Sequence, residues 1–175
     1  FKDTNFEIVS LLDFENNFEI IEDGNSFEEN AKIKAKYVFD KLKLPTIADD
    51  SGLCCEQLND APGIYSARYS GENATDENNN KKLLNELSKF PKPYKAKFVC
   101  SAVFYDGKDF ISTKGELSGE IADEPKGENG FGYDPIFIAD GYKITNGELS
   151  LVEKNKISHR ANAFLKLKQL LLKNI

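Results

Sequence analysis

The sequence predicts an α/β protein in which helices flank a mixed β-sheet. Three observations support this fold class. Helical and extended patterns alternate along the chain, one long β-hairpin occupies residues 96–121, and 40% of the 175 residues are hydrophobic. That content is enough to bury the core of one domain. No internal repeat or long linker divides the chain, so we expect a single domain over residues 1–175.

A first helix is predicted over residues 26–43. Ser26 can cap its N-terminus, and Glu29 stands three residues later, as in a capping box. Apolar residues then recur at helical spacing. Pro45 ends this pattern, because proline removes a helical hydrogen bond.

Extended structure is predicted on both sides of that helix. Residues 6–12 and 18–21 are apolar and rich in strand-forming residues, so we interpret both as strands or sheet edges. Residues 46–50 form a short apolar run that predicts a buried strand. We expect a turn at Ser51–Gly52 and a second strand over residues 52–58.

The middle of the chain combines loops, a helix and the hairpin. Residues 60–75 lack a steady period and predict a loop, whereas residues 76–88 predict a helix. Asp106–Gly107 favours a tight turn between the two long runs of the hairpin. A glycine-rich loop follows over residues 122–135.

Two more helices are predicted near the C-terminal end. Ser150 and Glu153 have the spacing of a second capping box. Ser158 can cap the last helix, which covers residues 159–172. These helices complete the alternation on which the α/β prediction depends.

The composition excludes several classes of protein. Lysine and arginine number 23 against 29 acids, a formal charge of -6, so a nucleic-acid polymer is not an expected partner. A small anionic ligand remains compatible with this charge. No apolar run approaches the roughly 20 residues of a membrane span. The three cysteines lack metal-ligand spacing and no secretory segment occurs, which predicts a reduced, cytoplasmic protein.

Adjacent carboxylates give the first candidate site. Asp49 and Asp50 end the run 46–50 and are followed at once by Ser51 and Gly52. Neighbouring side chains of a strand point to opposite faces, so one acid can face a cleft while the other braces a loop. A carboxylate at a strand end can bind Mg²⁺ or act as a base toward water near a phosphorus atom. The alternative is a polar turn without chemistry.

Glu29 and Lys34 on the first helix extend this candidate site. Glu29 has a structural role as the capping partner of Ser26. It also lies at a helix N-terminus, where a metal-bound phosphate can be held. Lys34 follows about one turn later and is either a solvated lysine or a phosphate contact.

A second candidate site lies in the glycine-rich loop. The segment GFGYDP places Phe131 and Tyr133 on either side of Gly132, with Asp134 beside them. Alternate aromatic residues can stack on a flat ring, and a neighbouring carboxylate can accept a hydrogen bond from a ring N–H. The alternative is that both aromatic rings pack in the core.

The only histidine, His159, belongs to a basic cluster with Lys154, Lys156 and Arg160. A lone histidine is more often structural than catalytic, but this cluster suits recognition of anionic or carbonyl oxygens. The candidate residues together give a metal–phosphate end and a flat-ring end, which predicts a nucleotide site. No G-x-x-x-x-G-K-[ST] phosphate loop occurs in the sequence.

Five segments, taken in chain order, resemble those of a known family. They are SFEENAKIKA, ADDSGL, APGIYSARYSG, GENGFGYDPIF and EKNKISHR. Together they resemble the inosine/xanthosine triphosphate pyrophosphatases, and the resemblance extends over residues 6–172. It implies an elongated mixed β-sheet with flanking helices, two lobes around a central substrate cleft, and a homodimer. It also implies Mg²⁺-dependent hydrolysis of ITP, dITP or XTP to the monophosphate and pyrophosphate.

The resemblance assigns roles to the candidate residues. Asp50 is expected to accept the proton of the attacking water, and Glu29 together with Asp50 to hold the metal. Ser51 and Lys34 are expected to contact phosphate. Recognition of the base and the remaining phosphate contacts are assigned to Phe131, Gly132, Tyr133, Asp134, Lys154, His159 and Arg160.

The chemistry of a 6-oxopurine agrees with these roles. Its C6 carbonyl accepts a hydrogen bond and its N1–H donates one, so a donor such as Arg160 and an acceptor such as Asp134 would pair with it. Adenine reverses both groups. Leaving such buried groups unpaired costs roughly 1–3 kcal/mol each, which predicts a preference against ATP.

One departure from the family pattern concerns the start of the chain. The family normally begins with a strand and a Thr/Ser-x-Asn-x-x-Lys loop that grips the triphosphate, and no such segment precedes Phe1 in this sequence. A molecule without that segment is expected to lack a core strand, the phosphate clamp and most activity. Two alternative functions therefore stay open: a non-catalytic nucleotide-binding protein, and a pyrophosphatase for other modified nucleotides.

Overall fold

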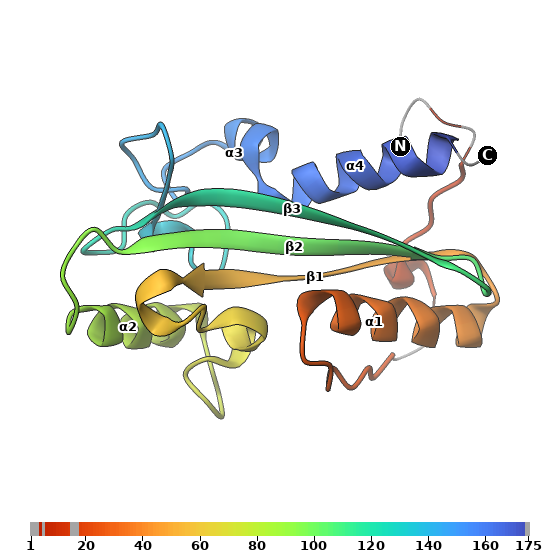
Figure 1. Ribbon diagram of the computed structural model, residues 1–175, viewed down its shortest axis with the longest axis horizontal. Helices are drawn as coiled ribbons and strands as arrows, with labels where there is room; N and C mark the ends of the chain where they lie inside the picture. The colour runs from red at the N-terminus through yellow and green to blue at the C-terminus, as the bar shows by residue number, and fades with distance from the viewer. Residues whose placement is uncertain (1–3, 5, 15–17, 174–175) are drawn as a thin grey trace.

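The computed structural model describes residues 4, 6–14 and 18–173 and is built around a four-stranded sheet. The strand order is β1-β2-β3-β4. The strands are β1 (Thr46–Cys55), β2 (Lys95–Tyr105), β3 (Phe110–Ile121) and β4 (Phe137–Ala139). The β2–β3 hairpin runs along most of the molecule, as predicted, and β1 follows its edge (Figure 1).

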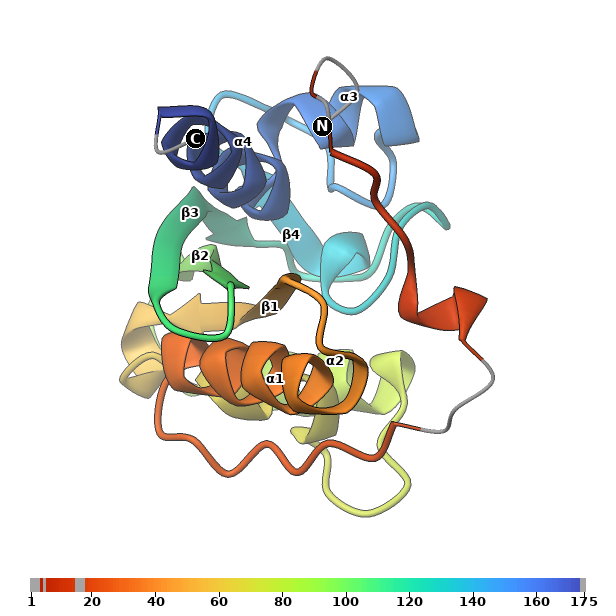
Figure 2. The same cartoon turned by 90° about the vertical axis from the view of Figure 1, so that its right-hand side faces the viewer.

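Helices cover both faces of this sheet, which confirms the α/β prediction. They are α1 (Phe27–Leu42), α2 (Asp76–Leu87), α3 (Leu151–Ile157) and α4 (His159–Lys173). Figure 2 shows α1 and α2 on one side of the sheet and α3 and α4 on the other. No helix in the described part of the chain is long and apolar enough to cross a membrane.

The predicted caps of these helices are present. Ser26 accepts a hydrogen bond from the Glu29 amide, and Ser150 and Glu153 form a complete capping box. Ser158 accepts from the amide of Ala161 in the first turn of α4. The helix boundaries follow the sequence closely because these contacts are local.

The sheet differs from the prediction in strand direction. Among the described residues, each strand pair is antiparallel, so the sheet is not mixed there. Residues 6–12 and 18–21 were predicted as strands, but they form no strand and contain only the short 3-10 helix Leu11–Asp13. The strand order leaves the outer edge of β1 without a described partner strand, and these residues do not pair with it.

The predicted turn at Ser51–Gly52 is also wrong, because β1 is one continuous strand. Ser51 pairs with Cys100 and Gly52 with Val99 in the register with β2. Gly52 is required for a different reason. A Cβ atom there would overlap the carbonyl oxygen of Gly63 and Oγ of Ser66, in the 3-10 helix Gly63–Arg68 that packs on β1.

Two small cores hold α1 and α4 against opposite faces of the same strands. Ala31 and Ala35 of α1 pack with Val103 and Tyr105 of β2. On the other face, α4 packs against β2 through three buried residues, Ala163, Leu167 and Leu171. A larger core at the other end of the sheet joins α2 to the strands and to the loop before β4. The two ends of the sheet therefore have separate cores, in keeping with the predicted two lobes.

Gly115 sets the distance between β3 and α4. A Cβ atom at this position would overlap the carbonyl oxygen of His159 and the amide nitrogen of Ala163. Only glycine allows this approach of the helix backbone to the strand. The N-terminal turn of α4, which carries two of the predicted site residues, is consequently positioned by direct backbone contact with β3.

We predict that Gly115→Ala destabilises the protein by about 1–3 kcal/mol, because the added methyl group must push α4 away from the sheet. Thermal or urea unfolding measures this change. Ser118→Ala is the matched control, since Ser118 is an exposed residue of the same strand. Equal stability of Gly115→Ala and the control would contradict the role of Gly115.

Candidate functional site

The carboxylate of Asp50 lies between β1 and α1, where it faces Lys34 and Asn30. Its Oδ1 lies 2.9 Å from Nζ of Lys34, and its Oδ2 accepts a hydrogen bond of 3.2 Å from Nδ2 of Asn30. Nζ of Lys34 also contacts Glu22 at 2.8 Å and the carbonyl oxygen of Asp49 at 3.2 Å. This end of the site therefore combines carboxylates with one cation.

The pKa of Lys34 reflects this surrounding. Burial acts to lower it, but the hydrogen bonds to Glu22 and Asp50 outweigh burial and raise the pKa above its ordinary value. Lys34 is therefore a permanent cation. The contact of Glu22 with Lys34 was not predicted from the sequence, because it depends on how the segment before α1 folds back along that helix.

Glu29 lies at the start of α1, on the same helix as Asn30 and Lys34. Its carboxylate accepts a hydrogen bond of 2.7 Å from the backbone amide of Asn25, one residue before the cap. Glu29 thus accepts from the amide of Asn25, whereas in a capping box it would accept from the amide of Ser26. No described group of three or more His, Cys, Asp or Glu side chains is arranged to hold a metal ion by itself.

Asp49 points to the opposite face of β1 from Asp50 and fixes Arg160. Nε of Arg160 donates to Oδ2 of Asp49 at 2.9 Å, and Nη2 donates to Oγ of Ser51 at 2.8 Å. The thiol of Cys100 donates to the same carboxylate at 3.5 Å. We expected one acid to face a cleft and the other to brace a loop; Asp49 instead holds Arg160, which belongs to α4.

The glycine-rich loop carries Phe131 above the basic residues. The Phe131 side chain is 62% exposed, and its ring lies 4.7 Å from Nζ of Lys154 and 5.8 Å from the Arg160 guanidinium carbon. An exposed ring above two cations is free to stack on a flat ligand. Tyr133, in contrast, is buried and donates from its hydroxyl to the carbonyl oxygen of Ser66, so only one of the two rings is available.

Asp134 is buried under this loop and already has several partners. It forms an ion pair with Lys154, accepts from the amide of Phe131 at 2.8 Å, and accepts from Nδ2 of Asn146 at 3.3 Å. Only 2% of Asp134 is exposed. Its carboxylate therefore shapes the loop and holds Lys154, a task that the sequence did not suggest.

A cavity of about 130 Å³ lies beneath the loop. Ser51 and Gly52 of β1 line one part of it, but Asp50 and Lys34 do not line it. Its other lining residues come from the loop, α2, α3, β2, the start of α4 and the 3-10 helix Gly63–Arg68; among them are Phe131, Gly132, Tyr133, Asp134, Lys154 and His159. The structure therefore brings the loop residues and the basic residues into one place.

His159 forms one wall of this cavity and is uncharged. Its ring stacks on Phe98 with centroids 4.8 Å apart and planes 10° apart. Burial, followed by the charges of Arg160 and Lys154, lowers its pKa to about 3. Nδ1 is buried without a hydrogen-bond partner among the described residues, so a donor or acceptor of the imidazole is available to a ligand.

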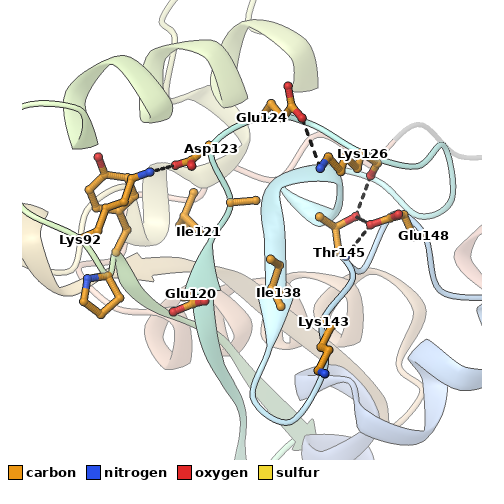
Figure 3. A pocket seen from close by; sticks show the side chains of 13 residues that line it. Lys92, Glu120, Ile121, Asp123, Glu124, Lys126, Ile138, Lys143, Thr145 and Glu148 are labelled. Atoms are coloured by element: carbon orange, nitrogen blue, oxygen red, sulfur yellow. Dashed lines mark hydrogen bonds and ion pairs between the residues drawn. The ribbon is translucent and has the colours of Figure 1, made fainter.

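A second hollow, of about 590 Å³, lies where β2 begins and β3 ends (Figure 3). It shares no lining residue with the cavity beneath Phe131. Lys92 pairs with Asp123, and Lys126 pairs with Glu124 at 3.3 Å, so these charges are neutralised within the wall. The hollow is larger than the cavity, but the described residues that line it include no exposed aromatic ring.

The sequence is similar to proteins of one family along its whole length. Residues 1–170 match the profile of the Ham1 family. A dITP/XTP pyrophosphatase of Thermoanaerobacter pseudethanolicus is 47% identical over 100% of this chain and 89% of its own length. A dITP/XTP pyrophosphatase of Bacillus subtilis is 46% identical over 95% and 85%. A HAM1 protein of Coxiella burnetii, known by its structure, superposes with a TM-score of 0.91 at 39% identity, covering 98% of this chain and 89% of that one.

We predict that His159 makes the protein less stable as the pH falls from about 6.5 toward 3. In this range the unfolded chain binds a proton at His159 and the folded protein does not, because the folded pKa is about 3. The free energy of unfolding should therefore rise with pH by up to about 1.4 kcal/mol per pH unit from this residue.

Urea unfolding of the parent and His159→Gln at several pH values measures this contribution. Carboxylates affect both proteins alike, so the difference between the two curves isolates the histidine. The curves should diverge below pH 6.5, with the parent losing more stability. Parallel curves over this range would show that His159 is protonated in the folded state.

Proposed function

The chain belongs to the Ham1 family, and we propose that it hydrolyses non-canonical purine nucleoside triphosphates such as ITP, dITP and XTP to the monophosphate and pyrophosphate. The observation that carries this proposal is the arrangement around Ser51–Gly52. Asp50 and Lys34 lie on one side of this segment, and the cavity beneath Phe131 lies on the other. A nucleotide bridging them would have its base in the cavity and its phosphate chain near Asp50.

Base recognition is proposed to combine stacking with donated hydrogen bonds. Phe131 would stack on the purine, and Arg160, held by Asp49, would donate to the C6 carbonyl. Because Asp134 already binds Lys154 and the loop backbone, we assign it first to holding this geometry. Pairing of Asp134 with N1–H of the base would require Lys154 to move toward the ligand.

At the phosphate end, Lys34 and Ser51 are proposed to contact phosphate oxygens. Lys34 retains its positive charge. Oγ of Ser51 accepts a hydrogen bond from Arg160, so the hydroxyl hydrogen of Ser51 can be donated to a phosphate oxygen. Asp50 is proposed to accept the proton of the attacking water. Its distance of 2.9 Å from Lys34 keeps the carboxylate in a fixed position, which matters more for a general base than an unusual pKa.

We propose Mg²⁺ as the cofactor, with Glu29 and Asp50 as protein ligands. The residues fit this ion. Mg²⁺ is usually bound by one or two carboxylates together with substrate phosphates, and the oxygens around Lys34 show that this region already stabilises a cation. When bound, the ion would neutralise charge on the phosphate oxygens. A homodimer remains a proposal from the family resemblance, and a cytoplasmic location remains a proposal from the cysteine content of the sequence.

One assay distinguishes the proposed function from two alternatives, a non-catalytic nucleotide-binding protein and a pyrophosphatase of broader specificity. Purified protein is incubated with Mg²⁺ and, in parallel, ITP, XTP, dUTP or ATP, and the pyrophosphate released is measured. We expect release from ITP and XTP well above that from ATP. Binding of ITP without pyrophosphate release would indicate a non-catalytic nucleotide-binding protein, and equal rates on all four would indicate a broader pyrophosphatase.

We predict that Asp50→Asn lowers kcat by at least about 100-fold with little loss of fold, because asparagine has nearly the same shape but is not a base. The ITP assay measures kcat, and thermal unfolding checks the fold. Asp40→Asn is the control, since it also removes an acid that pairs with a lysine, Lys36, but far along the exposed face of α1. Turnover near that of the parent would remove Asp50 from the mechanism.

We predict that Arg160→Ala lowers the ratio of kcat/KM for ITP over ATP by roughly tenfold, because it removes the donor to the C6 carbonyl. Lys156→Ala is the control, as it removes an exposed positive charge from the same segment. Both variants are assayed with ITP and ATP under identical conditions. An unchanged ratio in Arg160→Ala would contradict base recognition by this residue.

A further inference from the structure

The loop that carries Phe131 is tied to α2 by two hydrogen bonds at a single residue, Gly132. The carboxylate of Asp76 accepts from the Gly132 amide at 2.6 Å, and Nδ2 of Asn80 donates to the Gly132 carbonyl oxygen at 3.0 Å. Both α2 side chains are more than 50 residues from Gly132 in the chain. Together they hold the loop peptide on both sides of Gly132.

Few other contacts fix Phe131. Its side chain is 62% exposed, so packing does not determine where the ring lies. Gly132 has a φ of 62°, and a Cβ atom there would meet open space, so the backbone at this point is not wedged by neighbours. The ring position consequently depends on its contacts with Lys154 and Arg160 and on backbone hydrogen bonds: those of Gly132 to α2, and those that join Phe131 to Asp134.

Asn80 donates to Gly132 while another polar atom of its side chain stays unpaired. The residue is 5% exposed, and its Oδ1 is buried without a partner among the described residues. A buried amide with an unsatisfied oxygen is unfavourable compared with an apolar side chain of similar size. Among the described residues, the one side-chain hydrogen bond that Asn80 makes is to the loop.

We propose that Asp76 and Asn80 are positioning residues for base recognition: by holding Gly132 from both sides, they keep the Phe131 ring over the cavity in which the purine binds. The proposal rests on the proposed function of the cavity. It assigns the first two turns of α2 a role in substrate selection, although neither residue contacts the phosphate end. Asp76 also lines the cavity itself, whereas Asn80 does not, so the effect of Asn80 on the substrate is exerted through Phe131.

Asn80→Leu is the sharpest variant, because stability and binding should change in opposite directions. Leucine removes the unsatisfied Oδ1, and the Gly132 carbonyl, which is only half-buried, can turn to water. We therefore expect an equal or higher melting temperature together with a KM for ITP raised about fivefold and a nearly unchanged kcat. A residue with a purely structural role would lower stability and leave KM unaffected.

Asp76→Ala tests the other hydrogen bond, with Glu77→Ala as its matched control. Both acids lie in the first turn of α2, so both variants lose the same favourable interaction with the helix N-terminus. Glu77 makes no hydrogen bond to residues 127–134. Asp76→Ala should raise KM for ITP while Glu77→Ala leaves it unchanged. Equal KM values for ITP in Asp76→Ala, Glu77→Ala and Asn80→Leu would overturn the proposal.

A tryptophan reporter separates this proposal from the proposed function. The chain has no tryptophan, so Phe131→Trp places a single probe on the loop. Without nucleotide, its fluorescence anisotropy should fall when Asn80→Leu or Asp76→Ala is added, and should not change with Glu77→Ala. Lower anisotropy in a protein that does not hydrolyse ITP would support the tether and refute the function, whereas unchanged anisotropy would refute the tether whatever the activity.

Discussion

The alternation of side chains along β1 is the constraint on which the candidate site depends. Because successive residues of a strand face opposite sides, Asp50 meets Lys34 of α1 while Asp49 meets Arg160 of α4. The helices that supply these partners lie on opposite faces of the sheet, held there by separate cores. One uninterrupted strand thus joins the residues proposed for the phosphate end to those proposed for recognition of the base.

Local signals in the sequence were sufficient to predict the helices and the long hairpin. Ser26, Ser150 and Ser158 act on amides within three residues of themselves, so the information that defines each helix start is contained in the motif. The pair Asp49–Asp50 and the basic residues of the last motif could likewise be chosen from residue type and spacing. Their mutual contact, across more than 100 residues, could not.

The wrong predictions have a common physical cause, which is that they depended on distant partners. Gly52 indicated a turn, but its lack of a side chain instead makes room for Gly63 and Ser66. Residues 6–12 have strand-forming side chains but no described strand beside them. Nothing near these residues in the sequence reveals such neighbours.

The stacking of His159 on Phe98 has a consequence for how the protein responds to acidity. Histidine is the side chain that ordinarily changes charge close to neutrality, and here it is kept neutral next to two cations. The wall that it forms therefore presents the same electrostatic face to a ligand in mildly acidic and mildly alkaline surroundings. If selection among purines varies over that range, this imidazole is not the origin of the variation.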